Sequence, residues 1–178
     1  RFSLTPLELE KQPTDLTRML EQVASEFAPQ FAEKDLRCEL ELPPRLAYDC
    51  DPDKLARVFD NVLRNAVSYS TPGGRVDIQA KTVGRQAEIT IRNEGLEIPE
   101  GELANIFQKF YRLDAARSSR TGGAGLGLAI AKEIVESHGG NIRCESNGRL
   151  TSFVISLPLY KEVRHVFKRN RAGLSEPK

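Results

Sequence analysis

The chain has 178 residues and a net charge of +1, with 39% hydrophobic and 29% charged residues. Its length fits one domain with one core, and no run approaches the roughly 18 apolar residues of a membrane-spanning helix. The balanced charge gives no general case for nucleic-acid binding. Three scattered cysteines, Cys38, Cys50 and Cys144, argue against structural zinc and a disulfide framework.

The first third of the chain alternates between helical and strand patterns. Thr14 or Asp15 can cap a helix with an apolar stripe at helical spacing. Residues 37–42 alternate like a half-buried strand that a pair of prolines ends. Asp51, followed by proline, predicts a second helix with one apolar face that continues to Ala66. The stripe of the first helix consists of Leu16, Leu20, Val23, Phe27 and Phe31.

The rest of the chain is dominated by strand patterns. A turn signal at 71–74 ends the second helix, and Gly84-Arg85 would close a hairpin. Residues 94–124 form a long irregular connection, which usually has a functional reason. The mixture predicts an α+β two-layer sandwich with one face of the sheet covered. The elements expected here are strands at 76–81 and 87–93, a helix at 126–137, and strands near 141–146 and 152–157.

Two asparagines lie one turn apart on the flank of the Asp51 helix. Asn61 and Asn65 fall at the edge of its apolar face, where the wall of a pocket would lie. An exposed asparagine pair is usually only a solvated helix face. Asparagine is a middling helix former, however, and its carbonyl suits Mg²⁺, which takes one or two protein ligands and completes its shell with phosphates and water.

Two further segments could serve a nucleotide site. Gly95, within NEGLEIPEGE at 93–102, indicates a tight exit from the sheet, which an ordinary strand-end turn also explains. The segment IFQKFYRLD at 106–114 contains aromatic residues that would pin the long connection to the core. Arg112 and Arg117 would then face a polyanion, because guanidinium groups match phosphate oxygens.

The sequence GGAGLGLAIA at 122–131 leads a glycine-rich loop into an apolar helix. Its glycines allow a close backbone approach, and a helix that begins near Leu126 offers N–H groups to an anion. It is neither a Walker A loop nor a Rossmann fingerprint, because no Gly-Lys-Ser/Thr follows and no strand leads into it. The loop alone is weak evidence, but it completes an ordered series with the asparagine helix, the strand-end glycine and the aromatic-basic segment.

Together these segments resemble the ATP-binding domain of sensor histidine kinases, the Bergerat fold. NVLRNAVSYS, NEGLEIP, IFQKFYR, GGAGLGLAIAKEIVESHGG and GRLTSFVISLP look like that family's N, G1, F, G2 and G3 boxes, and the similarity spans about residues 5–158. Within the family the chain looks most like the vancomycin-resistance (VanS-like) sensor kinases. The resemblance implies a mixed, mostly antiparallel sheet, three main helices on one face and a long ATP lid.

The resemblance also implies roles at the matching positions of the base and metal sites. Asn65 would bind Mg²⁺, and Asn61 would support the phosphate side. Tyr69 would stack on adenine, and Gly95 would let the backbone approach the base. Asn93 stands where the family usually has the Asp that accepts the adenine amino proton.

Further roles fall on and beside the lid. Arg112 would reach toward the γ-phosphate and would be catalytic together with Asn61 and Asn65. The glycines would hinge the lid and line the phosphates, while Leu126 would pack beside them. The nucleotide-contacting residues expected in this segment are Lys109, Arg112, Arg117, Gly123, Gly125, Leu126 and Gly127.

Four positions depart from the family or from related ATPases. Asn93 replaces the adenine-reading Asp, and Glu97 replaces the second glycine of DxGxG, which would stiffen the loop. Ser68 replaces a frequent Lys, so the basic residues of the lid must supply more of the charge that faces the phosphates. Asn61 stands where related ATPases carry a Glu that activates water, so we expect slow hydrolysis and favoured transfer to a protein acceptor.

The chain lacks a recognisable phosphoacceptor histidine. His138 is expected to cap a helix and His165 lies in a basic tail, and neither is followed by the Glu/Asp-x-x-Thr/Asn pattern. The resemblance implies that the acceptor comes from a helical dimerisation domain, which normally lies just upstream of Arg1. The chain begins without a methionine, as an excised piece would. The expected parts are the exit from that domain and first strand (1–12), the catalytic domain (13–158) and the basic tail (159–178).

The expected parent protein is a bacterial, membrane-anchored homodimeric sensor with this domain in the cytoplasm. ATP and Mg²⁺ would be its cofactors, a response regulator its partner, and the isolated fragment would be monomeric. Two other functions stay open: a Bergerat-fold protein serine kinase, and a nucleotide-sensing module without catalysis.

Overall fold

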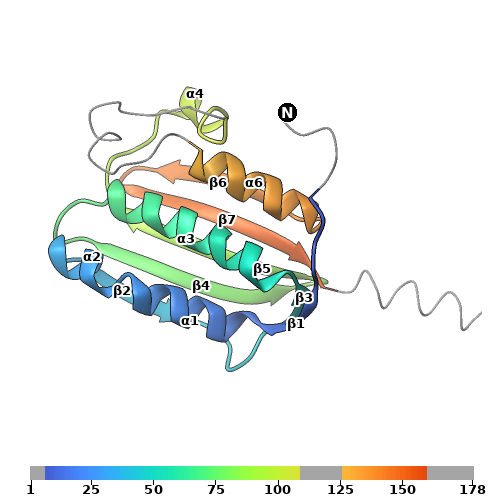
Figure 1. The fold of residues 1–178 in the computed structure, drawn as a ribbon. Coiled ribbons are helices and arrows are strands. Elements are labelled where there is room, and N and C mark those ends of the chain that lie inside the picture. The colour runs from blue at the N-terminus through green and yellow to red at the C-terminus, as the bar shows by residue number, and fades with distance from the viewer. Residues whose placement is uncertain (1–6, 109–125, 160–178) are drawn as a thin grey trace, which may run out of the picture.

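The computed structural model describes residues 7–108 and 126–159, in which helices cover one face of a sheet (Figure 1). The predicted α+β two-layer sandwich is confirmed. In chain order the elements are β1 (Gln12–Asp15), α1 (Leu16–Glu26), α2 (Ala28–Glu33), β2 (Arg37–Glu41), β3 (Ala47–Cys50), α3 (Pro52–Ser68), β4 (Arg75–Val83), β5 (Gln86–Glu94), α4 (Glu100–Leu103), α6 (Gly127–Ser137), β6 (Asn141–Asn147) and β7 (Leu150–Pro158).

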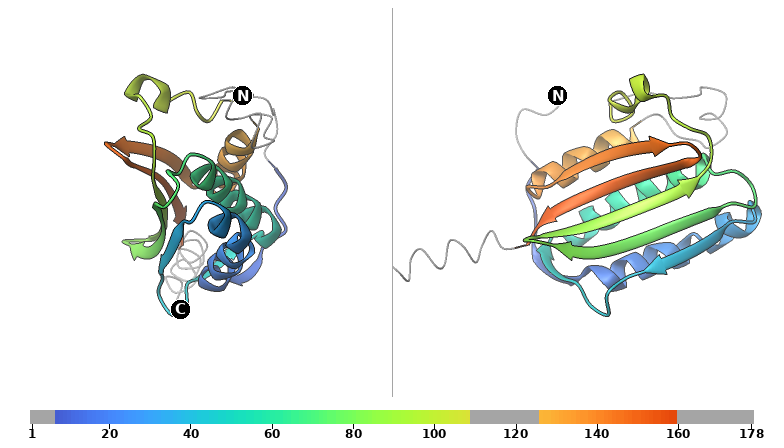
Figure 2. Two further views of the ribbon diagram at one scale, coloured as in Figure 1. Left: turned by 90° about the vertical axis from the view of Figure 1, so that its left-hand side faces the viewer. Right: turned by 180° about the vertical axis from the view of Figure 1, so that it is seen from behind.

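The main sheet has five strands in the order β2-β4-β5-β7-β6. β2 pairs with β4 in parallel and the other neighbours are antiparallel, as the resemblance implied. The right-hand view of Figure 2 shows the sheet from the face that no helix covers. Side chains alternate between the two faces of β4 and β5, and Val76, Ile78, Ile89 and Ile91 are buried under the helices.

The helices α1, α3 and α6 pack side by side on one face of this sheet (Figures 1 and 2). α3 lies between the other two, and its apolar stripe is almost completely buried. Because a buried large side chain stabilises the fold by about 1.5–3 kcal/mol, this stripe fixes the rotation of α3 about its axis. Its buried residues are Leu55, Val58, Phe59, Val62, Leu63, Ala66 and Val67.

The first predicted helix is broken in two. α1 ends at Glu26, Phe27 is its C-cap, and α2 begins at Ala28. Pro29 is the reason, because a proline tolerates the first turn of a helix but removes a hydrogen bond and clashes in a helix interior. Phe31 still reaches the core from α2, so the apolar stripe was correct and the continuous helix was wrong.

The sequence analysis did not predict the small sheet formed by β1 and β3. These strands pair antiparallel, with Gln12 opposite Cys50 and Asp15 opposite Ala47. Each has only four residues, and β1 contains a proline, so neither shows the alternation that marks a strand. The first strand, expected within residues 1–12, lies at Gln12–Asp15.

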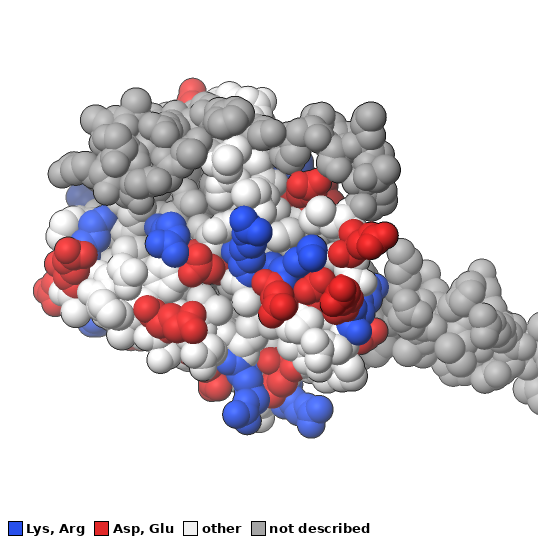
Figure 3. Space-filling view, in the orientation of Figure 1, with Lys and Arg blue, Asp and Glu red and all other residues white. Residues whose placement is uncertain are grey.

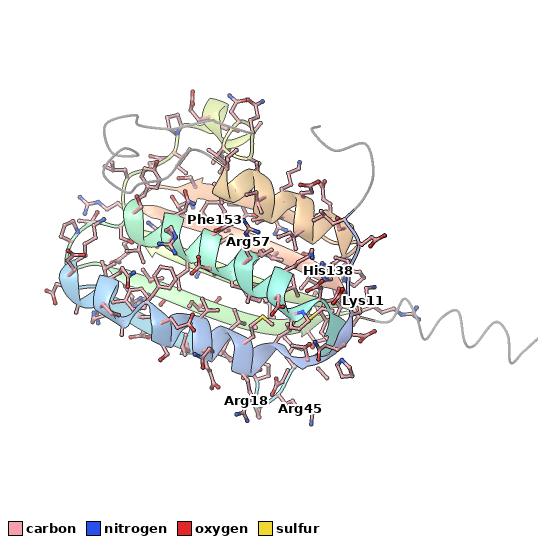
Figure 4. All side chains as sticks on the ribbon, in the orientation of Figure 1. Lys11, Arg18, Arg45, Arg57, His138 and Phe153 are labelled. Carbon is pink, nitrogen blue, oxygen red and sulfur yellow. The ribbon has the colours of Figure 1, made fainter. Side chains whose placement is uncertain are left out.

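The long connection after β5 is partly described. It contains the short helix α4, and Ile106 is buried. The ring of Phe107 packs edge-on against Phe153 of β7, with ring centroids 6.2 Å apart; Figure 4 labels Phe153. These contacts confirm that aromatic residues pin the start of the connection to the core. Most of the expected lid, residues 109–125, lies outside the described part.

The surface of the helical layer carries charged side chains of both signs. Acidic and basic side chains are interspersed over the face that α1 and α3 present (Figure 3). Within the described ranges, no helix is both long and apolar enough to cross a membrane.

Cys38, Cys50 and Cys144 are free thiols. Burial raises the pKa of Cys38 to about 11 and that of Cys144 to about 12, so both stay protonated at neutral pH. In residues 7–108 and 126–159, no group of three or more His, Cys, Asp and Glu residues is placed to hold a metal ion.

Candidate nucleotide site

The asparagine pair lies on the flank of α3, as predicted. Asn61 and Asn65 are half-buried beside the core-facing stripe. Asn65 Nδ2 donates a hydrogen bond to the carbonyl oxygen of Asn61 at 3.0 Å. This bond uses the amino end of the Asn65 amide, so the carboxamide oxygen is the end that can bind a cation.

Asn61 connects α3 to the helix that follows the glycine-rich loop. Its Nδ2 donates to the carbonyl oxygen of Gly127, the first residue of α6, at 3.0 Å. α3 and α6 run antiparallel on the sheet, so this bond joins the second half of α3 to the start of α6 (Figure 1). The structure therefore brings together two segments that the sequence analysis assigned to one site.

At the start of α6, Leu126 is the N-cap residue, and its side chain cannot accept a hydrogen bond from the first turn. A Cβ atom on Gly127 would lie 3.7 Å from Asn61 Cγ, which is an ordinary contact. Neighbouring protein atoms among the described residues therefore give no steric reason for glycine here. The expected role of Gly127 beside phosphates stays a prediction.

Asn93 lies near the end of β5 with only 2% of its surface exposed. Its Nδ2 is buried and has no hydrogen-bond partner within the described part of the chain. A buried donor without a partner costs about 1–3 kcal/mol, and native structures contain few of them. The donor end of the Asn93 amide is therefore unsatisfied by the described residues, while its Oδ1 is an acceptor.

Gly95 must be glycine because of Tyr69. A Cβ atom at this position would lie 2.1 Å from the Tyr69 carbonyl oxygen and 3.0 Å from Asn93 Nδ2. Gly95 also forms a bridge with Ser70, and its N–H donates to the carbonyl of Arg149 at 2.8 Å. The sequence analysis predicted a close backbone approach here, but the partner that the structure provides is the end of α3. Contact with a base stays a prediction.

Tyr69 is the C-cap of α3, and its N–H donates to the carbonyls of Asn65 and Val67. Ser68 is the last helical residue and is half-buried. Glu97 is exposed in the loop after β5, next to Ile98, whose N–H donates to Ser146 Oγ at 2.9 Å. The two helix-end positions thus lie together, while Glu97 belongs to a separate loop.

Five expected site residues lie outside the described residues: Lys109, Arg112, Arg117, Gly123 and Gly125. Their roles stay predictions.

His138 is the C-cap of α6, as predicted. Its Nε2 accepts the N–H of Asp51 at 3.1 Å and its Nδ1 donates to the carbonyl of Ile134 at 2.9 Å. The ring is 4% exposed, and burial lowers its pKa. His138 lies at the C-terminal end of α6, whereas Asn61 contacts Gly127 at its start. Figure 4 labels His138 and Lys11. His138 is therefore a neutral structural residue.

One residue near the site was missed. Lys34, at the C-terminus of α2, donates to backbone carbonyls at the end of α3. Nothing in the sequence around Lys34 indicates this contact, because its partners lie 33 to 36 residues further along the chain.

Known proteins give a consistent assignment. A family model described as histidine kinase-, DNA gyrase B-, and HSP90-like ATPase matches residues 50–161. The chain belongs to this family of ATPases, and it is therefore an ATP-binding domain. Its fold is that of the catalytic domain of histidine kinases.

The similar curated proteins are sensor kinases. The chain is 49% identical over 158 residues to the sensor protein VanS of Enterococcus faecium, covering 89% of this chain and 41% of VanS. It is 41% identical over 158 residues to the sensor protein VanSC of Enterococcus gallinarum, covering 89% and 44%. The chain thus spans less than half the length of these relatives.

Solved structures show the same fold. The mycobacterial sensor histidine kinase MprB is 29% identical, with a TM-score of 0.74 over 84% of this chain and 98% of that chain. Full-length ShkA in complex with AMPPNP is 25% identical, with a TM-score of 0.77 over 87% and 32%. Histidine kinase ThkA in complex with the response regulator protein TrrA is 22% identical, with a TM-score of 0.73 over 85% of this chain and 42% of that chain, which shows the fold alone.

Proposed function

We propose that this chain is the catalytic domain of a two-component sensor kinase. It would bind ATP and present the γ-phosphate to a histidine on a separate upstream domain, which would then phosphorylate a response regulator. The observation that carries the proposal is the hydrogen bond from Asn61 Nδ2 to the Gly127 carbonyl, because it joins the asparagine helix to the start of the glycine-loop helix.

A metal ion fits the residues on α3. The amino group of the Asn65 amide donates to the Asn61 carbonyl, and its neutral carboxamide oxygen is a ligand of the kind that Mg²⁺ accepts. The described residues hold no carboxylate or histidine cluster for a metal, so protein ligands would be few and phosphate oxygens would complete the shell. When bound, Mg²⁺ would neutralise charge on the phosphates.

A base fits the end of β5. The Asn93 carboxamide is buried near the end of β5 and carries an acceptor oxygen, Oδ1. An adenine amino group could donate to Oδ1. Tyr69 is half-buried at the adjoining end of α3, and its ring would stack on the base. AMPPNP, which ShkA binds, is an ATP analogue and supports a nucleotide with this base.

The phosphates would lie at the start of α6. Its N-cap residue, Leu126, leaves the first-turn N–H groups without a side-chain partner of its own, and the helix dipole favours an anion there. Arg112, Lys109 and Arg117 would add positive charge from the lid. Arg112 would lie nearest the γ-phosphate.

The phosphoacceptor would come from elsewhere in the protein. His138 uses both ring nitrogens in hydrogen bonds to backbone groups and is buried, so neither nitrogen can attack a phosphate. A nucleophile brought by a separate domain would be aligned with the bound phosphate, and alignment and charge neutralisation would supply the catalysis.

Transfer is favoured over hydrolysis at this site. A water molecule needs a base to take its proton, and the amide of Asn61 cannot serve at neutral pH. Asp60, the neighbouring acid on α3, forms an ion pair with Arg64 at 3.0 Å on the half-exposed surface. We therefore propose slow hydrolysis of bound ATP.

The whole protein would be a bacterial membrane-anchored homodimer with this domain in the cytoplasm. Residues 1–12 would lead out of the dimerisation domain, residues 13–158 would be the catalytic domain, and 159–178 a basic tail. The isolated chain would be monomeric. The likeness to VanS and VanSC supports a role in vancomycin-resistance signalling.

Titration calorimetry tests the nucleotide site. The chain should bind ADP more tightly with Mg²⁺ than with a chelator, and should bind GDP more weakly than ADP. Binding without any dependence on Mg²⁺ would remove the metal assignment. Absence of ADP binding in a folded chain would remove the proposed function.

A further inference from the structure

The last turn of α3 ends without a left-handed cap residue. Helices commonly end with a glycine at positive φ, which satisfies the free carbonyls of the final turn. Tyr69, the C-cap of α3, has φ −99° and ψ 6°, and the nearest residue with a positive φ in the described chain is Gly73, four positions further on. The carbonyls of this turn must therefore find other partners.

Three of these carbonyls accept hydrogen bonds from Tyr69 and Ser70, at the end of the helix itself. The carbonyl of Asn65 accepts the N–H of Tyr69 at 3.1 Å. The carbonyl of Ala66 accepts the buried hydroxyl of Ser70 at 2.6 Å. The carbonyl of Val67 accepts the N–H of Ser70 at 3.2 Å. The carbonyls of Ser68 and Ser70 need a partner from outside this turn.

Lys34 supplies that outside partner. Its Nζ donates to the carbonyl oxygens of Val67 at 2.8 Å, Ser68 at 2.9 Å and Ser70 at 3.1 Å. An ammonium group has three N–H donors, so one side chain can serve all three carbonyls. The cation also lies at the negative end of the α3 dipole, where a positive charge is favourable.

The main chain of Lys34 is also fixed by hydrogen bonds. Its N–H donates to Gln30 at 3.3 Å, and its carbonyl accepts the N–H of Gly73 at 2.9 Å. The next residue, Asp35, has φ 56° and turns the chain into β2. Lys34 therefore reaches α3 from a fixed position.

The turn at the end of α3 supports both the metal side and the base side of the candidate site. The turn that Lys34 contacts follows directly on Asn65 and includes Tyr69. The residue after it, Ser70, forms the bridge to Gly95, and the N–H of Thr71 donates to the carbonyl of Glu94 at 2.9 Å. A shift of the turn would move the asparagine, the tyrosine and the end of β5 together.

We propose that Lys34 is a positioning residue of the nucleotide site. Its ammonium group fixes the last turn of α3, so that the Asn65 carboxamide, the Tyr69 ring and the β5 end keep the spacing that a nucleotide needs. Lys34 acts through the backbone and does not itself contact the nucleotide. This inference rests on the proposed function.

The test compares the chain with Lys34→Met, which keeps the aliphatic stem and removes the charge, and with Lys34→Arg, which keeps the charge. ADP is titrated with Mg²⁺ at a temperature where circular dichroism shows every variant folded. Lys34→Met should bind ADP roughly tenfold more weakly, because small displacements of positioning groups have large effects. Lys34→Arg should recover most of the affinity.

A matched control separates positioning from general stability. Asp15 caps α1 and accepts the N–H groups of Thr17 and Leu46 at 3.1 Å and 3.0 Å. Neither partner belongs to the end of α3 or to β5. Asp15→Ala should lower the melting temperature and leave ADP affinity unchanged. If Asp15→Ala weakens ADP binding as much as Lys34→Met does, the positioning role is wrong.

A milder variant keeps the test usable if Lys34→Met does not fold. Ser70→Ala removes the hydroxyl bond to Ala66 from the same turn and should weaken ADP binding in the same direction, but less. Wild-type ADP affinity in folded Lys34→Met contradicts the inference about Lys34 but not the proposed function. If Lys34→Met does not fold, wild-type ADP affinity in folded Ser70→Ala has the same consequence. No ADP binding by the unsubstituted chain contradicts the proposed function and this inference with it.

Discussion

The carbonyl oxygen of Tyr69 occupies the space where Gly95 would carry a Cβ atom, at 2.1 Å. The end of α3 and the end of β5 are thus packed backbone against backbone. Any side chain at position 95 must move one of them.

We expect Gly95→Ala to destabilise the domain by about 1–3 kcal/mol, the usual cost of overpacking. It should also weaken ADP binding, because the new methyl group would displace the Tyr69 carbonyl and the Asn93 amide. Urea unfolding and ADP titration measure the two effects. Gly101→Ala is the control, because no atom of the described residues lies within 4 Å of a Cβ there. It should leave ADP affinity unchanged and should not lower stability, since alanine is a better helix former than glycine. Equal stability of the two variants would contradict the packing argument.

Asn65→Ala should remove the Mg²⁺-dependent part of ADP affinity and leave the fold intact. The side chain is half-buried on the helix flank, and its hydrogen bond stays within α3. The measurement is ADP titration with Mg²⁺ and with chelator. Arg57→Ala changes an exposed residue of the same helix and should have no effect. A folded Asn65→Ala variant with an undiminished response to Mg²⁺ would rule out this ligand.

Asn93→Asp should tighten ADP binding by on the order of fivefold, because a charged acceptor makes a hydrogen bond about twice as strong as a neutral one. Desolvation of the new carboxylate limits the gain. Asn93 is 2% exposed, so the same substitution should also lower the stability of the ligand-free chain. Calorimetry with ADP and GDP measures the binding, and GDP affinity should not change. Unaltered or weaker ADP binding would show that Asn93 does not contact the base.

Stability should fall as the pH drops from 7.5 to 5.5 because of His138. Burial lowers its pKa in the folded state below the ordinary value of 6.5, so the unfolded chain takes up the proton first. The loss begins as the pH falls through 6.5 and has a slope of at most about 1.4 kcal/mol per pH unit. Asp51 does not interfere, because its pKa is lowered from 3.8, mainly by the N–H of Glu10, and it stays ionised throughout.

Urea unfolding at the two pH values measures this effect. The control is His138→Gln, which should be less stable than the wild type at pH 7.5 and should lose less stability on acidification. A difference between the two proteins that does not depend on pH would show that His138 is not the titrating group.

The parts of the fold that the sequence predicted are those with long, regular patterns. α3 has a proline at its start, a capping Asp51 and an apolar face from Leu55 to Val67, and its position was predicted closely. Buried and less buried side chains alternate along all nine residues of β5 and along the first six of β4, and Gly84 with φ 60° makes the turn between them. Local pattern and tertiary packing agree in these elements.

The parts that were missed depend on contacts between distant residues. β1 and β3 are too short to show a pattern and exist because Gln12 and Cys50 are brought opposite each other. The break at Phe27 needed more weight on Pro29 than on the apolar spacing. Lys34 and the Tyr69–Gly95 contact join residues more than 25 positions apart, which no local motif records.

The candidate site was predicted through the order of its motifs rather than through single residues. Asn61 and Asn65 lie on the predicted flank, and Asn61 reaches Gly127 as a shared site requires. The reason for Gly95 came only from the structure. Residues 109–125 fall outside the described part, so the lid cations stay predictions.

The central claim is tested most directly by phosphotransfer to a separately supplied helical dimerisation domain of the parent protein. The chain is incubated with γ-labelled ATP and Mg²⁺, alone and with that domain. The account predicts acid-labile label on the histidine of the helical domain, none on the chain itself, and no transfer with Asn65→Ala. Stable label on the chain alone, acid-stable label on a serine, or no transfer by a chain that binds ATP would contradict it.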